Sequence, residues 1–212
     1  MIIGLVGFIG SGKGTVGDIL VREHGYRQFA FADALKDAVA TIFTWPRGLL
    51  EGDSNASRAF RERVDVWWSN KLGYEVTPRL ILQKFGTEAC REGIADNIWI
   101  AALEKRIHGY DDVVISDVRF PNEIKFIREA GGVIFRVKRG DDPVWYNDAL
   151  STNTVGINTM EEYKVHESEW AWIGQKIDAE IINEGTKDEL KVQVKRILTK
   201  QEKANTIFHH SV

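Results

Sequence analysis

The 212-residue chain contains one cysteine, four prolines and two methionines. The single cysteine, Cys90, excludes an intrachain disulfide and is typical of a protein that stays in the reducing cytoplasm. No residue near Cys90 in the sequence would activate its thiol, so we expect Cys90 to be buried and neutral. The shortage of cysteine therefore predicts a cytoplasmic protein without redox chemistry at this position.

The chain also lacks long apolar runs and a surplus of basic residues. No run approaches the roughly 18 apolar residues that indicate a membrane-spanning helix. The apolar residues 2–6 have no basic segment before them, so a secretory signal is not expected. The net charge is −3, without the basic stripe that is typical of proteins that bind a nucleic-acid backbone. Neither a membrane nor a nucleic acid is an expected partner.

Glycine is not scarce, and its most informative cluster follows residues 2–6. Residues 7–15 read Gly-Phe-Ile-Gly-Ser-Gly-Lys-Gly-Thr, with the Walker A spacing from Gly7 to Gly12-Lys13. Glycines let backbone N–H groups surround phosphate oxygens, and the first turn of a following helix adds unpaired N–H donors. A plain glycine-rich turn would not require Lys13. We call residues 7–15 the glycine-rich loop and expect it to hold nucleotide phosphates through Gly10, Ser11, Gly12, Lys13, Gly14 and Thr15.

The loop departs from the general motif at Gly14, where a serine or threonine normally contacts the metal ion. Thr15 follows one position later, and this Gly-Lys-Gly-Thr variant resembles adenylate kinase and other nucleoside monophosphate kinases. The departure moves the search for a second magnesium ligand to another part of the chain. Asp117 is the candidate, because it ends an apolar run and carboxylates bind magnesium.

Apolar runs alternate with helical patterns along the chain, which predicts a parallel α/β sheet. The expected strands are residues 2–6, 27–31, 112–116, 133–138 and 179–183. We therefore predict one P-loop kinase-like domain over residues 1–212, with a five-stranded parallel sheet flanked by helices. Within it we expect a partly helical, acceptor-side insertion at 46–75, a long polar and aromatic loop at 139–165, and a frayed tail at 201–212. Thr77-Pro78 has the pattern of a helix start.

Ligands of such sheets bind beyond the carboxyl ends of the strands. Asp117 and Arg119 follow the strand at 112–116, and Arg139 follows the strand at 133–138. Phosphoryl transfer requires in-line placement, positive charge on the transferred group and exclusion of water. Residues 139–165 are therefore a candidate lid, with a disordered surface insertion as the alternative. For Asp117 the alternative is a cap on the turn before Pro121.

A nucleotide site in an acidic protein needs a local concentration of cations. The candidates for that charge are Lys13, Lys36, Arg79, Arg91, Arg119, Arg136, Lys138 and Arg139.

Further short motifs follow the glycine-rich loop in order. They are Phe31-Ala32-Asp33-Ala34-Leu35-Lys36, Leu82-Gln83-Lys84-Phe85-Gly86-Thr87-Glu88, Ile115-Ser116-Asp117-Val118-Arg119, Val137-Lys138-Arg139, His166-Glu167-Ser168-Glu169 and Ile182-Asn183-Glu184-Gly185-Thr186. Together they resemble the phage-type deoxynucleoside monophosphate kinases. The resemblance covers most of the chain except residues 46–75 and the middle of 139–165.

The resemblance implies ATP-dependent phosphorylation of a (deoxy)nucleoside monophosphate with magnesium, in the host cytoplasm if a phage encodes the chain. It implies catalytic roles for Lys13, Asp117, Arg119 and Arg139, and metal contacts from Asp117 and Thr15. The acceptor-side residues would be Asp33, Lys36, Arg79, Gln83 and Thr87. A homodimer is a further expectation.

Several alternatives stay open on the sequence. Gln83 offers a donor and an acceptor to a base edge, but an ordinary helix-surface glutamine has the same pattern. His166 is either catalytic or a structural cap. The accepted base is guanine, thymine or a modified base, and the sugar is ribose or deoxyribose. A P-loop kinase of another small metabolite and a non-catalytic nucleotide-binding module are the rival functions.

Overall fold

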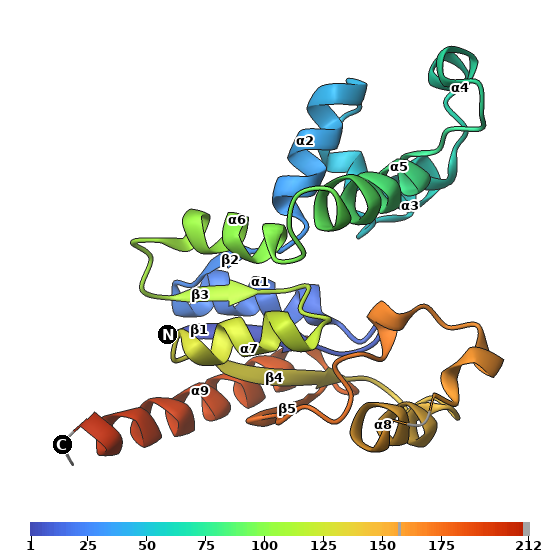
Figure 1. The fold of residues 1–212 in the computed structure, drawn as a ribbon. Helices are drawn as coiled ribbons and strands as arrows, with labels where there is room; N and C mark the ends of the chain where they lie inside the picture. The colour runs from blue at the N-terminus through green and yellow to red at the C-terminus, as the bar shows by residue number, and fades with distance from the viewer. Residues whose placement is uncertain (157, 210–212) are drawn as a thin grey trace. The chain divides into compact units, whose positions relative to one another are not determined.

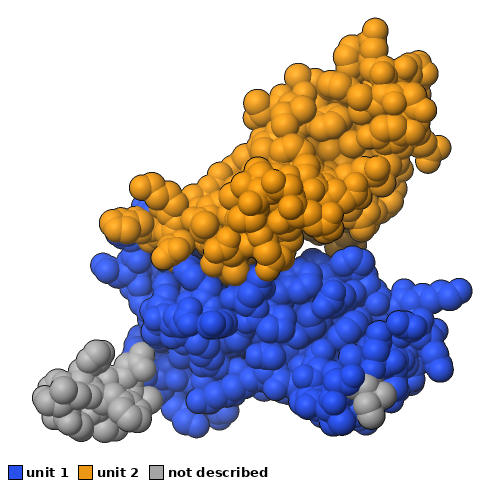
Figure 2. All heavy atoms as spheres, viewed as in Figure 1, with its two compact units in different colours: residues 1–29, 109–212 blue, residues 30–108 orange. Residues whose placement is uncertain are grey.

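The computed structural model describes residues 1–156 and 158–209. The chain divides into two compact units, coloured separately in Figure 2. Unit 1 comprises residues 1–29 and 109–212, and unit 2 comprises residues 30–108. Among the described residues, no helix is both long enough and apolar enough to cross a membrane.

Unit 1 contains the predicted five-stranded parallel sheet (Figure 1). Its strands are β1 (Ile2–Val6), β2 (Arg27–Phe29), β3 (Val113–Ile115), β4 (Val133–Lys138) and β5 (Ala179–Ile182), in the spatial order β2-β3-β1-β4-β5. All pairs are parallel, and β1 lies between β3 and β4. The loops that follow β1, β3 and β4 therefore leave the sheet side by side, where ligands of such sheets bind.

The second strand ends earlier than predicted. The sequence indicates a strand over 27–31, whereas β2 ends at Phe29. The N–H of Ala30 donates to Oδ2 of Asp33 over 2.8 Å, so the backbone turns toward the next helix. A short polar side chain thus captures a donor that a longer strand would give to its neighbour.

Helices cover both faces of the sheet. Helices α1 (Lys13–His24) and α9 (Lys187–His209) share a core with Ile3 and Leu5 of β1. The intervening Gly4 points to the other face, where an added Cβ would come within 2.7 Å of Ile127 in α7 (Pro121–Glu129). The period-two alternation of β1 therefore places α7 directly against the strand opposite α1 and α9.

The segment 139–165 is not the loop that its composition indicates. It contains helix α8 (Tyr146–Val155) and the short 3₁₀ helix η3 (Met160–Tyr163). Helix α8 could not be predicted from apolar periodicity, because Ala149 is its only buried residue and the helix therefore has no apolar stripe. Helix α9 likewise includes residues 201–209 of the expected frayed tail, and residues 210–212 lie outside the described part of the chain.

Unit 2 is helical. It contains α2 (Asp33–Phe43), η1 (Arg47–Leu50), α3 (Asn55–Glu62), α4 (Val66–Leu72), α5 (Pro78–Lys84), the π-helical segment η2 (Phe85–Glu92) and α6 (Ile98–Ile107). The helical content predicted for residues 46–75 is thus present. Helix α5 starts as predicted, because the Thr77 hydroxyl accepts from the N–H of Leu80 and Pro78 occupies the first turn. Cys90 is buried in η2, and burial raises the pKa of its thiol, as expected for an inert cysteine.

Candidate functional site

The glycine-rich loop has a backbone that only glycine accommodates at two positions. Gly7 and Gly12 have φ values of 142° and 98°. A Cβ at Gly7 would clash with the carbonyl of Val137, and one at Gly12 would clash with the amide of Asn183. Asn183, which follows β5, donates from Nδ2 to the carbonyl of Ser11 over 2.9 Å. The predicted strand–loop–helix unit is therefore confirmed, with neighbours from β4 and β5 fixing the shape of the loop.

Two polar side chains of the loop fit a phosphate ligand. Nζ of Lys13 donates to the carbonyls of Gly7 over 2.6 Å and Phe8 over 3.0 Å, which folds the side chain back over the loop. The hydroxyl of Ser11 is buried and has no hydrogen-bond partner among the described residues. A buried hydroxyl without a partner is costly, and a phosphate oxygen would satisfy it. Helix α1 begins at Lys13, within the loop, and directs its first N–H groups to the same place.

Electrostatics identifies the groups around Lys13. The pKa of Lys13 is lowered from 10.5 to about 8, first by burial of its ammonium group and second by the positive charge of Arg119. The carboxylates of Glu169 and Asp117 oppose this shift. Asp117 and Arg119 follow β3, the neighbour of β1, so the parallel sheet explains why they lie near Lys13. The structure thus brings together three residues that the sequence nominated and adds Glu169.

Arg119 is held at both its backbone and its side chain. Its N–H and that of Phe120 donate to Oε2 of the buried Glu123, over 2.8 and 3.1 Å, which caps α7. Its Nη1 donates to Oγ of Ser168 over 3.2 Å and to Oε1 of Glu169 over 3.3 Å. Ser168 and Glu169 belong to the short 3₁₀ helix η4 (Glu167–Glu169). The sequence motif around His166 therefore lies beside a candidate catalytic arginine.

The donor set for a metal ion is small. No group of three or more histidine, cysteine or acidic side chains that could enclose a metal occurs among residues 1–156 and 158–209. Magnesium is commonly bound by one or two protein oxygens, with substrate phosphates and water completing its octahedron. The carboxylate of Asp117 and the hydroxyl of Thr15 suit that mode of binding.

The cations near the end of β4 differ in environment. Arg139, a predicted catalytic residue, is exposed at the strand end. Lys138 pairs with Asp142 over 3.4 Å. Arg136, which the sequence nominated for nucleotide charge, is buried and pairs with Asp142 and, over 3.5 Å, with Glu180.

Aromatic rings surround the guanidinium of Arg136. Its Cζ lies 5.0 Å from the ring centre of Tyr146, 5.3 Å from that of Trp172 and 6.0 Å from that of Phe8. We call Arg136, Phe8, Tyr146 and Trp172 the Arg136 cluster. Phe8 belongs to the glycine-rich loop and Tyr146 to α8, so the cluster joins the loop to the segment 139–165. The guanidinium of Arg136 is therefore engaged in packing and ion pairs and is not free to bind a nucleotide. The position of Arg136 within the apolar strand Val133–Lys138 was the feature of the sequence that indicated burial.

The acceptor-side candidates lie in unit 2, and two of them belong to an ion network. Nζ of Lys36 donates to Glu51 over 2.7 Å, and Oδ1 of Asp33 accepts from Arg47 over 3.1 Å. Arg47 also binds Glu51 and, over 2.6 Å, Asp37. Burial works to raise the pKa of Glu51, but hydrogen bonds from Lys36 and Arg47 outweigh it and lower the pKa. Arg47 joins the three carboxylates, and no sequence motif pointed to it.

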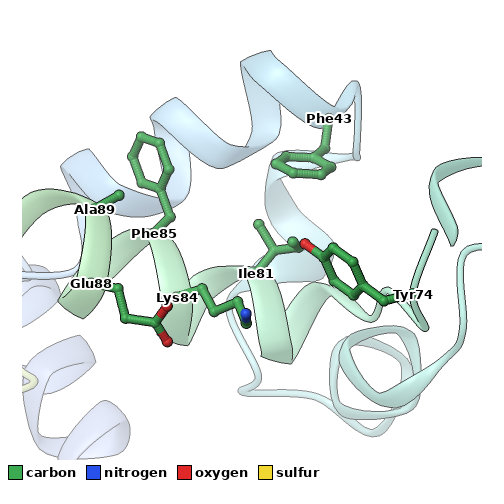
Figure 3. A pocket seen from close by; sticks show the side chains of 7 residues that line it. All are labelled: Phe43, Tyr74, Ile81, Lys84, Phe85, Glu88 and Ala89. Carbon is green, nitrogen blue, oxygen red and sulfur yellow. The ribbon is translucent and has the colours of Figure 1, made fainter. Parts of the chain in front are cut away.

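The remaining acceptor-side candidates follow one another at four-residue intervals along α5 and η2. Arg79 pairs with Glu62 at the surface, and Gln83 and Thr87 are exposed. A cavity of about 380 Å³ lies beside helices α5 and η2 (Figure 3). Its lining is Phe43, Tyr74, Ile81, Lys84, Phe85, Glu88 and Ala89. None of the predicted acceptor residues lines it, so their role stays a prediction.

Comparison with known proteins found two relatives, and both are named as monophosphate kinases of deoxynucleotides or deoxynucleosides. The chain is 32% identical over 180 residues to a protein of Acanthamoeba polyphaga mimivirus named "Putative deoxynucleotide monophosphate kinase", covering 78% of this chain and 86% of the relative. It is 48% identical over 56 residues to the deoxynucleoside-5′-monophosphate kinase of Escherichia phage T5, covering 26% of this chain and 22% of the phage protein. No model of a protein family matches the chain.

Solved structures whose backbones align with most of this chain include two kinases. Shikimate kinase from Aquifex aeolicus has a TM-score of 0.46 at 17% identity, covering 97% of this chain and 99% of that protein. A gluconokinase from Sinorhizobium meliloti has a TM-score of 0.45 at 16% identity, covering 99% of this chain and 97% of that protein.

Proposed function

The chain belongs to the deoxynucleotide monophosphate kinase family, and we propose that it transfers the terminal phosphoryl group of ATP to the 5′-phosphate of a deoxynucleoside monophosphate. One observation carries the donor half of this proposal. A glycine-rich loop holds Lys13 in the electrostatic field of Arg119 and Asp117, and the buried hydroxyl of Ser11 in that loop has no hydrogen-bond partner in the described part of the chain.

The reaction needs little covalent help from the protein. The bond between the terminal phosphorus and its bridging oxygen breaks, and an oxygen of the acceptor phosphate forms the new bond. The acceptor oxygen is already an anion at neutral pH, so no general base is required. Lys13 and Arg119 donate hydrogen bonds to the oxygens of the group in transfer and neutralise its charge.

Magnesium would be held by Asp117 and Thr15, and when bound it would supply positive charge that offsets the negative charge of the donor phosphates. Arg139 adds a further cation at the end of β4. Residues 139–165 act as a lid that excludes water, which would otherwise accept the phosphoryl group. The Arg136 cluster supports this role, because it ties the start of the segment to the glycine-rich loop while most of α8 stays weakly buried.

On the acceptor side we propose Asp33, Lys36, Arg79, Gln83 and Thr87 as the residues that bind the nucleoside monophosphate. All five lie in unit 2, beside or within helices α2, α5 and η2. Both substrates are small molecules, and the whole chain acts as one kinase domain. A homodimer, which the family implies, is checked by the mass of the protein in solution.

The experiment that tests the proposal is an ADP-release assay with ATP and each common ribo- and deoxyribonucleoside monophosphate. A parallel panel contains small hydroxyl acceptors without a base. We expect release to depend on a deoxynucleoside monophosphate, with the matching diphosphate as product. Release with a non-nucleotide acceptor, or ATP binding without acceptor-dependent release, would contradict the proposal.

A further inference from the structure

The motif His166-Glu167-Ser168-Glu169 has no assigned role, and the structure places it as a polar turn. His166 caps η4, because its Nδ1 accepts from the N–H of Ser168 over 3.2 Å. An Nδ1 that accepts a hydrogen bond carries no proton. The hydroxyl of Ser168, 2.9 Å away, therefore donates its proton to the same nitrogen. This bond fixes the rotamer of Ser168 and leaves a lone pair of its hydroxyl oxygen directed away from His166.

The outward lone pair of Ser168 receives Arg119. Nη1 of Arg119 donates to Ser168 and also to the carboxylate of Glu169. Both bonds use the same nitrogen, and within residues 1–156 and 158–209 no hydrogen bond engages Nη2 or Nε of Arg119. Two acceptors on one side of the guanidinium restrict its rotation while its other donors stay available for a phosphate.

The backbone of the same turn is anchored to the glycine-rich loop. The indole of Trp172 donates to the carbonyl of Glu169 over 3.0 Å, and Trp172 is only 2% exposed. Its ring centre lies 5.3 Å from that of Phe8 in the loop. A continuous set of contacts thus runs from the loop through Trp172 and Glu169 to Arg119.

We propose that Ser168 and Glu169 are positioning residues that hold the guanidinium of Arg119 in place near Lys13, and that His166 fixes Ser168 in the accepting rotamer. This inference rests on the proposed function, since it concerns the orientation of a catalytic arginine. Misplacing a catalytic group by about 1 Å can cost about 10²-fold in rate. The turn acts through Arg119 and does not itself touch substrate.

The test is a double-mutant cycle on Arg119 and Glu169, with kcat and both KM values measured. We expect Glu169→Leu to lower kcat about 10- to 100-fold while the KM for ATP changes less than about threefold. Glu169→Gln keeps an oxygen acceptor and should recover most of that loss. Arg119→Ala should cost about 10²-fold or more, and adding Glu169→Leu to it should cost almost nothing further. Glu129→Leu, at an exposed position of α7, is the matched control.

Independent losses in the double mutant would overturn the inference, because Glu169 would then act without Arg119. A fall in the KM for ATP in Glu169→Gln would also overturn it, because Glu169 would then compete with phosphate. If Arg119→Ala itself keeps full activity, the assigned role of Arg119 fails instead, so the two failures are distinguishable.

A second set of variants covers the case that Glu169→Leu does not fold. His166→Asn places an oxygen acceptor near the position of Nδ1, whereas His166→Leu removes the acceptor. We expect Asn to retain kcat within about threefold and Leu to lower it about tenfold, with melting temperatures of both variants recorded. Equal kcat values for the two variants would refute the role of His166.

Discussion

The donor half and the acceptor half of the proposed site differ in how their residues are arranged. In unit 1, Lys13 comes from one part of the chain and Asp117 and Arg119 from another, and the charges of Asp117 and Arg119 act on Lys13. In unit 2, Lys36 and Asp33 are engaged with acidic and basic partners, Arg79 binds Glu62, and Gln83 and Thr87 are exposed. In the first set the charges of Asp117 and Arg119 act on Lys13, whereas in the second set Lys36 and Asp33 pair with Glu51 and Arg47, and Arg79 pairs with a different residue, Glu62.

The difference has a physical origin. Residues that follow neighbouring parallel strands are brought together by the hydrogen-bond register of the sheet, which allows little variation. Residues on separate helices meet only if side-chain packing sets the helices at the right angle and rotation. A motif placed at a strand end is therefore a stronger guide to a site than the same residue types on helices.

The largest expected effect breaks the donor half. Lys13→Met removes the cation that lies over the glycine-rich loop and should lower kcat/KM by about 10³-fold, because charge on the transferred group is no longer neutralised. The fold should survive, since the methylene stem remains. Steady-state kinetics with a melting curve checks this, and Lys125→Met at an exposed site of α7 is the control. A folded variant with near-normal turnover would refute the donor assignment.

The pH dependence of the donor half should show two opposite trends. The pKa of Lys13 is about 8 in the folded protein, against 10.5 ordinarily. Above about pH 8 the free enzyme loses the charge of Lys13, so kcat/KM for ATP should fall about tenfold per pH unit. Between about pH 8 and 10.5 the unfolded chain binds more protons than the folded one, so the contribution of Lys13 to the free energy of unfolding should rise with pH.

Lys13→Arg provides the control for this profile. A guanidinium stays charged throughout the range. If the descending limb persists in Lys13→Arg, the limb belongs to another group.

A smaller effect tests whether the ion network of unit 2 serves catalysis. Lys36→Met should raise the KM for the nucleoside monophosphate about tenfold and leave the KM for ATP within about twofold, because a charged hydrogen bond to the acceptor is lost. Glu51 keeps Arg47 as a partner, so the melting temperature should change little. A lower melting temperature with unchanged KM would show that Lys36 is purely structural.

The smallest effect sharpens the placement of the base. Gln83→Leu should raise the KM for the preferred nucleotide about threefold to tenfold, because an amide that pairs with the base edge is lost. Glu88→Gln, which alters the cavity of Figure 3, should change it less than about twofold. KM values measured for nucleotides with several different bases decide whether Gln83 or the cavity binds the base. The reverse order would place the base in the cavity and not beside Gln83.

Much of the site could be predicted from the sequence where backbone geometry sets it. The glycine spacing, Lys13 and the strand-end residues Asp117 and Arg119 make up the proposed donor half. Glu169, Arg47 and the aromatic surroundings of Arg136 could not be predicted, because each depends on packing between segments far apart in the chain. Helix α8 was hidden for a related reason, since its aromatic start packs on Phe8 and it has no apolar stripe of its own.

The sequence by itself determined the parallel sheet, the glycine-rich loop and the family, because apolar periodicity, glycine spacing and short ordered motifs are read directly along the chain. The tertiary structure decided which charges face one another. It buried Arg136 among aromatic rings, left Arg139 exposed and placed Arg119 against Ser168 and Glu169. Composition cannot distinguish these three arginines, since the environment of a charge is set by neighbours that only the folded chain brings near it.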